Sequence, residues 1–163
     1  MRKLAMLAGL AALAAFARPV FAHCQVPCGI FTDTLRIHMM REDLATIEKA
    51  MKMIEEIGAA EKPNWNQLVR WVTTKEDHAE KIMDCVAAYF LAQRVKVPPA
   101  DADGAALAAY HAQLSTLHRL TVAAMKTKQT TELRWVFECR KLVDEFAASY
   151  FSPEDLKHLE EHK

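Results

Sequence analysis

The residues with the most reactive side chains lie together in one short stretch, HCQVPCGIF, which spans residues 23–31 and which we call the hook. It offers the imidazole of His23 and the thiols of Cys24 and Cys28. Imidazole and thiolate are ligands that soft and borderline transition metals bind well. The types and spacing of these residues therefore predict a metal site.

The residues before the hook have the pattern of an export signal. Residues 1–22 begin with two basic residues, continue with an apolar run over residues 4–16 and end in the small-x-small sequence VFA. The apolar run is shorter than the roughly 20 residues of a membrane-spanning helix, which disfavours an uncleaved anchor. We therefore expect a processing peptidase to remove residues 1–22, so that the mature chain begins at His23.

This cleavage changes the chemistry of the hook, because it exposes a new α-amine. A metal held by that amine, by the amide nitrogen between His23 and Cys24, and by the Cys24 sulfur closes two five-membered chelate rings. Pro27 and Gly29 allow a tight turn, so Cys28 can fill the fourth corner. A flat set of two nitrogens and two sulfurs suits Ni(II) or Cu(II), whereas zinc prefers a tetrahedron. With the imidazole on the axial face, the hook is predicted to be a one-electron redox site.

The hook resembles the H-C-x-x-P-C-G-x-Y motif of the nickel superoxide dismutases. This resemblance implies a four-helix bundle that assembles as a homohexamer, with one nickel ion per subunit. It implies that His23 provides its amine and, in the oxidised state, its imidazole. Cys24 would provide an amide nitrogen and a thiolate, and Cys28 the second thiolate. The implied reaction converts superoxide into dioxygen and hydrogen peroxide by cycling between Ni(II) and Ni(III).

Four positions depart from the family pattern. Phe31 stands where the family usually has a tyrosine, and Gln25 stands where an acid is common. His38 and His78 fall in the regions of the acid and the arginine that steady the axial imidazole in the family, but no role is transferred to either residue. The effect of these departures on the reaction rate is left open.

Beyond the hook, apolar residues recur at alternating steps of three and four, which is typical of amphipathic helices. Glycines and prolines divide the pattern into four helices. The first ends near Gly58, the second runs over residues 64–96 and the third over residues 103–126. The fourth follows a KTKQTT turn at residues 126–131. Asn64 is predicted to cap the second of these helices. Ser152 and Pro153 then begin a short tail helix. The predicted inward residues include Ile37, Met40, Leu44, Ile47, Met51, Trp65, Leu68, Val72, Ala79, Ile82, Val86, Tyr89, Leu107, Tyr110, Leu114, Leu117, Val136, Val143, Phe146 and Tyr150.

Four long amphipathic helices with short connections hide their apolar faces best by packing against one another. We therefore predict an all-α fold, an antiparallel up-down four-helix bundle with an N-terminal hook and a short C-terminal helix. The whole chain has 163 residues, 52% of them hydrophobic, which fits a single domain over residues 23–163. Its net charge is zero, so nothing suggests a nucleic-acid partner, and no segment of the mature chain is apolar enough to enter a membrane.

Several features have simpler readings. Cys24 and Cys28 can form a disulfide instead of binding metal, as exported cysteines often do. Cys85 and Cys139 lie among apolar positions and are predicted to be core residues, with a bridge between them as the alternative. His111 and His118 share a helix face, but isolated histidines are favoured over a metal pair. Lys75 interrupts the inward stripe of its helix, and we hypothesise that the hook packs there.

Two functions are compatible with these observations. The favoured one is a periplasmic or extracellular nickel superoxide dismutase; a cytoplasmic enzyme with a cleaved propeptide is the alternative location. The second is a non-catalytic exported carrier or sensor of nickel or copper, built on the same bundle. Turnover of superoxide distinguishes them, because a carrier binds metal without cycling it.

Overall fold

The computed structural model describes residues 33–161, without the side chains of residues 158, 160 and 161. The predicted leader and the hook lie outside the described residues. The helices are α2 (Asp33–Gly58), α3 (Trp65–Asp84), η1 (Cys85–Arg94), α4 (Gly104–Gln129), α5 (Arg134–Tyr150) and α6 (Pro153–Glu161).

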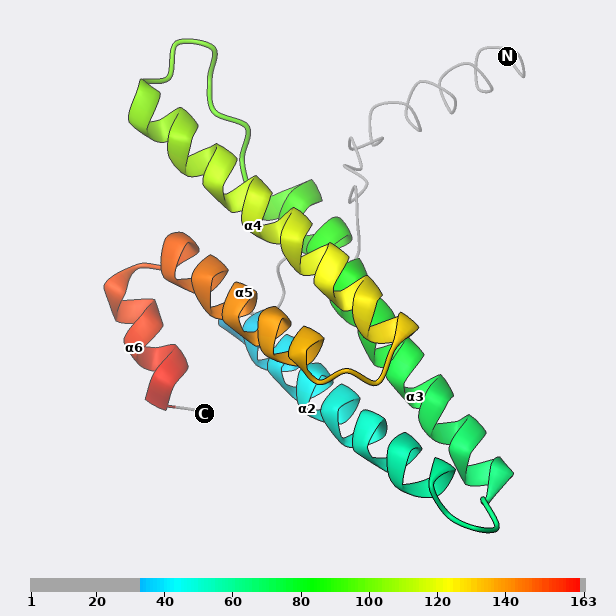
Figure 1. The fold of residues 1–163 in the computed structure, drawn as a ribbon. Coiled ribbons are helices and arrows are strands. Elements are labelled where there is room, and N and C mark those ends of the chain that lie inside the picture. Colours follow the sequence, from blue (N-terminus) through cyan, green and yellow to red (C-terminus); the bar gives the residue numbers. More distant parts are fainter. Residues whose placement is uncertain (1–32, 162–163) are drawn as a thin grey trace, which may run out of the picture.

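The long helices run alternately up and down (Figure 1). The chain descends along α2 and returns through α3 and η1, which form one continuous rod; α4 then packs along this rod, and α5 packs against both α4 and α2. The short α6 turns back beside α2. The predicted all-α bundle with a short C-terminal helix is therefore confirmed, and residues 33–161 contain no strand.

The core is built from the stripes that the sequence predicts. In α2 the large buried side chains recur at steps of three and four, and they are Ile37, Met40, Leu44, Ile47 and Met51; the small Ala50 is buried beside them. The other helices add Ala79, Ile82, Val86, Phe90, Leu117, Leu120, Val136, Leu142, Val143 and Phe146. Burial of one such large apolar side chain contributes about 1.5–3 kcal/mol, so these stripes hold the bundle together.

Two residues predicted to point inward are exposed instead. Trp65 is 68% exposed, because it is the first residue of α3, at the tip of the bundle. Leu107 is 42% exposed, because the first turns of α4 extend beyond the other helices (Figure 1). Both predictions were wrong for the same reason: periodicity identifies the apolar face of a helix but not how far its neighbours reach along it.

Side chains cap several helix starts. Asn64 Oδ1 accepts a hydrogen bond of 3.2 Å from the Gln67 backbone N–H, which confirms the predicted cap of α3. At α6, Ser152 Oγ accepts one of 3.2 Å from the Asp155 N–H, as expected from its position before Pro153. These caps satisfy backbone donors that have no partner inside the helix.

The predicted helix over residues 64–96 changes its hydrogen-bond pattern near its end. The ten residues Cys85–Arg94 form the π-helix η1, in which each N–H bonds to the carbonyl five residues earlier. The Val95 N–H continues this pattern with a 2.8 Å bond to the Phe90 carbonyl. The wider turn brings side chains five residues apart closer to one face than an α-helix does.

Lys75, the interruption in the inward stripe, is only 4% exposed. Its Nζ donates hydrogen bonds of 2.7 Å and 2.6 Å to the carbonyls of Thr127 and Lys128, at the end of α4. These carbonyls have no partner within α4, and a cation is favoured at this end of a helix. The two contacts explain the buried lysine and why α4 continues to Gln129, into the predicted turn.

The hypothesis that the hook packs on Lys75 stays untested, because the hook lies outside the described residues. Within residues 33–161, no helix combines the length and the apolar character that crossing a membrane requires.

Candidate functional site

The predicted metal ligands, His23, Cys24 and Cys28, lie outside the described residues, but the point where the hook joins the bundle is described. Asp33, the first residue of α2, follows Phe31 by two positions. Consecutive Cα atoms are about 3.8 Å apart, so the last hook residue lies within about 8 Å of the Asp33 Cα. The surroundings of Asp33 are therefore the surroundings of the end of the hook.

Both oxygens of the Asp33 carboxylate are bound by side chains from other helices. The Tyr89 hydroxyl donates a hydrogen bond to Oδ1, and the Tyr150 hydroxyl donates one of 2.6 Å to Oδ2. Arg94 Nε lies 3.1 Å from Oδ1 as an ion pair, and Arg94 Nη2 donates a 3.0 Å hydrogen bond to the Tyr89 hydroxyl. We call Asp33, Tyr89, Arg94 and Tyr150 the Asp33 cluster.

The environment keeps both phenols of this cluster protonated. Burial raises the pKa of Tyr89, and its hydrogen bond to the Asp33 carboxylate raises it further. The pKa of Tyr150 is raised strongly by the same two causes, burial being the larger. Hydrogen bonding to Tyr89 raises the pKa of Arg94. The cluster is thus a carboxylate held by two O–H donors and a permanent cation.

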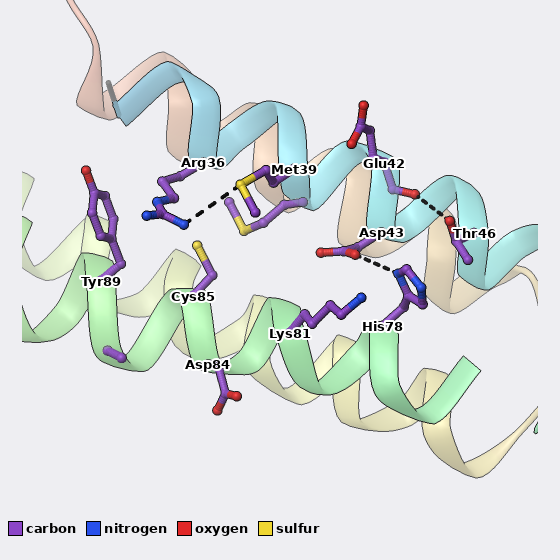
Figure 2. A pocket seen from close by; sticks show the side chains of 12 residues that line it. Arg36, Met39, Glu42, Asp43, Thr46, His78, Lys81, Asp84, Cys85 and Tyr89 are labelled. Atoms are coloured by element: carbon purple, nitrogen blue, oxygen red, sulfur yellow. Dashed lines mark hydrogen bonds and ion pairs between the residues drawn. The ribbon is translucent and has the colours of Figure 1, made fainter. Parts of the chain in front are cut away.

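A pocket of about 690 Å³ opens between α2 and the rod formed by α3 and η1 (Figure 2). Residues of α2 form one wall and residues of α3 and η1 the other. The lining residues are Arg36, Met39, Met40, Glu42, Asp43, Thr46, His78, Lys81, Asp84, Cys85, Ala88 and Tyr89. Arg36 follows Asp33 by one helical turn, and Tyr89 belongs to the Asp33 cluster, so this interhelix pocket begins beside the end of the hook.

One end of the interhelix pocket is formed by Tyr89 and the residues around it. The Arg36 guanidinium lies 4.8 Å from the centre of the Tyr89 ring, which is a cation–π distance. Arg36 Nη1 also approaches the Met39 sulfur at 3.8 Å. Figure 2 shows the Cys85 thiol directed toward this group from the opposite wall. This end combines one cation, one aromatic face and soft sulfur atoms.

The other end holds a histidine and a carboxylate. His78 Nδ1 lies 2.6 Å from Asp43 Oδ1 (Figure 2). A carboxylate can only accept, so we assign the proton to Nδ1, which leaves Nε2 as the acceptor nitrogen of the neutral ring. Lys81 extends along the same wall (Figure 2). His38, the other histidine without an assigned role, is half-buried on α2 and does not line the pocket.

The two cysteines of the bundle are free thiols, so the alternative of a bridge between them is wrong. Cys139 is buried in the core as predicted, and burial raises its pKa to about 12. Cys85 is only partly buried and lines the pocket, and burial raises its pKa to about 11. Both thiols are therefore protonated near neutral pH and react slowly.

The remaining candidates do not assemble into a second site. His111 and His118 are both exposed on α4, and His118 lines a smaller surface pocket with Trp135 and Glu138. In the described part of the chain, no group of three or more histidine, cysteine, aspartate or glutamate side chains is arranged to hold a metal ion.

Sequence reasoning did not identify the Asp33 cluster. Asp33 reads as an ordinary acid at the start of a helix, and its partners Tyr89 and Tyr150 lie 56 and 117 residues away. No periodicity connects residues at such separations. The one local signal was that Asp33 follows the end of the hook by two positions.

Comparison with known proteins gives one match. No curated protein and no solved structure matches the chain. A model of the family described as nickel-containing superoxide dismutase matches residues 18–154.

Proposed function

The chain belongs to the nickel-containing superoxide dismutases and is thus an oxidoreductase that uses nickel; on this premise, we propose that His23, Cys24 and Cys28 hold the metal in the mature chain. The observation that carries this proposal is the family match, which covers the hook together with the bundle. The family also favours the enzyme over the metal carrier.

The donors of the hook fit nickel. The amine and amide nitrogens of residues 23 and 24 and the sulfurs of Cys24 and Cys28 would hold the metal, and Ni(II) binds such a set of nitrogen and sulfur donors well. The imidazole of His23 would add a further nitrogen donor. The described bundle supports this assignment, because the interhelix pocket begins within one turn of the start of α2, where the hook joins the bundle.

When bound, nickel supplies a one-electron couple that oxidises one superoxide to dioxygen and reduces a second to hydrogen peroxide. The residues of this chain provide the surroundings. Arg36 and Lys81 place positive charge on opposite walls of the interhelix pocket. Three acids, Glu42, Asp43 and Asp84, line the same pocket, so its basic residues are outnumbered by its acidic ones. Tyr89 keeps its proton because burial and the hydrogen bond to Asp33 raise its pKa, and its O–H donates to Asp33 Oδ1 rather than into the pocket.

The same proposal includes the processing, export and assembly of the chain. Residues 1–22 are a leader that a peptidase removes, and export delivers the enzyme to the periplasm or the extracellular space. The mature chain, residues 23–163, forms one domain and assembles as a homohexamer. N-terminal sequencing of the native protein tests the first step: a start at any residue other than His23 contradicts it.

The metal site is tested with the mature chain, beginning at His23 and supplied with nickel. We expect about one nickel per chain and rapid consumption of superoxide. Cys24→Ser and Cys28→Ser should lose both, and one extra residue before His23 should nearly do so, because the amine is then misplaced. A correctly processed chain that neither binds nickel nor consumes superoxide would overturn the proposal.

A further inference from the structure

The Asp33 carboxylate joins three helices at the point where the hook leaves the bundle. Asp33 begins α2, Tyr89 and Arg94 lie on η1, and Tyr150 is the last residue of α5. We infer that the Asp33 cluster is a positioning device that fixes the end of the hook beside the interhelix pocket. The inference rests on the proposed function, because it assigns a role in holding the metal-bearing segment in place.

The contacts of Asp33 exceed what a helix start needs. An acid in the first turn is favourable through the helix dipole alone, and this effect requires no partner from another helix. Here Oδ2 accepts from Tyr150 at 2.6 Å, while Oδ1 faces both Tyr89 and Arg94. Hydrogen bonds to a charged acceptor are the stronger kind, and three partners leave the carboxylate one orientation. These contacts fix the side chain of Asp33, two residues after the end of the hook.

The π-helix makes this arrangement possible. Tyr89 and Arg94 are five residues apart, and the widened turn of η1 brings both side chains to Asp33. The Tyr89 ring also lies between two guanidinium groups, with Arg94 at 5.0 Å and Arg36 at 4.8 Å from its centre. Since Tyr89 is 3% exposed, it cannot move without disturbing these neighbours. Tyr89 therefore connects the end of the hook rigidly to the pocket wall.

Chain length shows what this fixed point controls. Cys28 precedes Asp33 by five residues, so its reach is at most about 18 Å. Tyr89 and His78, at the two ends of the pocket, are eleven residues apart on one rod, which is about 16 Å. A distance of this order lies within the reach of Cys28 from Asp33. A loose end would let the hook sample a larger volume and lower the effective concentration of its ligands at the pocket.

The test uses the mature, nickel-loaded protein and two conservative variants. Tyr89→Phe and Tyr150→Phe, singly and together, remove only the hydroxyls that hold Asp33. Nickel content should stay unchanged, because every metal donor is intact. Amide hydrogen exchange of residues 23–32 should accelerate by about tenfold or more in the double variant, since hydrogen bonds to a charged group are lost. The paramagnetic resonance spectrum of the oxidised metal should broaden as its surroundings become heterogeneous.

Matched controls separate positioning from general destabilisation. Asp144→Asn removes the 2.7 Å ion pair between Arg41 and Asp144, which also links α2 to α5 but involves no residue of the Asp33 cluster. Its hook exchange and spectrum should equal those of the wild type. Asp33→Glu keeps the charge and should restore part of the protection that Asp33→Ala loses.

The failure of this inference differs from the failure of the proposed function. If the wild-type chain holds nickel and consumes superoxide, but the double tyrosine variant shows unchanged hook exchange and an unchanged spectrum, the positioning role is wrong. If the wild-type mature chain binds no nickel at the hook, the proposed function fails, and the positioning role fails with it.

Discussion

The side chain of Lys75 shows how one buried polar residue can complete a helix. Replacing it by methionine keeps most of the apolar stem but leaves the carbonyls of Thr127 and Lys128 without their donor. Buried acceptors that lose their partners cost about 1–3 kcal/mol, and we expect Lys75→Met to lower the free energy of unfolding by this amount. Urea unfolding followed by circular dichroism measures the loss.

The exposed Lys52 provides the control for this prediction. It pairs with Glu48 at 2.5 Å on the surface of α2, and exposed pairs of this type contribute little. Lys52→Met should therefore leave the urea midpoint nearly unchanged. Equal midpoints for both variants would show that Lys75 does not stabilise the end of α4.

The two phenols of the Asp33 cluster predict a dependence of stability on pH. Their pKa values are raised in the folded protein above the ordinary value of 10.0, so the folded state retains their protons when the unfolded chain begins to lose them. The contribution is complete below about pH 10 and is lost as the pH rises through the folded pKa values. The free energy of unfolding should fall more steeply above pH 10 in the wild type than after Tyr89→Phe and Tyr150→Phe together. Parallel pH profiles would contradict this linkage.

At the scale of the element, losing the cap of α4 is expected to affect the first turns of this helix and not the stability of the whole bundle. Asp103 Oδ1 caps this helix by accepting a 2.7 Å hydrogen bond from the Ala106 N–H, and residues 103–109 are exposed. Loss of a helix cap usually lowers the free energy of unfolding by about 0.5–2 kcal/mol. At an end that packs on no other helix, the first turns can unfold locally, so the stability of the rest of the protein changes less. Asp103→Ala should therefore speed amide exchange over residues 104–109 and change the global unfolding free energy by less than about 0.5 kcal/mol.

Hydrogen exchange and urea unfolding of the same Asp103→Ala sample check this prediction. A global loss as large as the cap energy would mean that the start of α4 is packed more tightly in solution than its exposure indicates. The element-scale conclusion is that helix ends beyond the bundle tolerate change, whereas the end of α4 that contacts Lys75 does not.

At the scale of the molecule, the fold and the metal are expected to be nearly independent. The core that the structure describes, between Ile37 and Leu159, is formed by residues of the bundle. The predicted ligands lie within one short stretch that can bind metal in the unfolded chain as well. A ligand stabilises a protein only as far as it prefers the folded state. Removing nickel with a chelator should abolish superoxide consumption but lower the unfolding free energy by less than about 1 kcal/mol.

Thermal and urea unfolding with and without chelator measure this independence. A large drop in the midpoint after nickel removal would show that the bound hook is a structural part of the bundle. The comparison is made on the mature chain, so that the amine of His23 is available in both samples.

The sequence by itself determined the features that depend on neighbours along the chain. The steps of three and four from Ile37 to Met51 predicted which face of α2 is buried, and Asn64 and Ser152 were identified as caps, because helix geometry converts short spacings directly into positions. The donor set of the hook was readable for the same reason, since its predicted chelate rings involve adjacent residues. The all-α class followed from these local patterns.

The tertiary structure decided what depends on how the helices are offset and rotated. It assigned Lys75 to the end of α4, exposed Trp65 and Leu107, and brought Tyr150 to Asp33 across 117 residues. A hydrophobic stripe specifies a direction but not a partner or a register, and long-range polar contacts leave no trace in its period. The π-helix η1 is also a feature that only the tertiary structure shows. The local sequence does not distinguish its hydrogen-bond pattern from that of an α-helix, and the pattern occurs together with contacts to Asp33 from another helix.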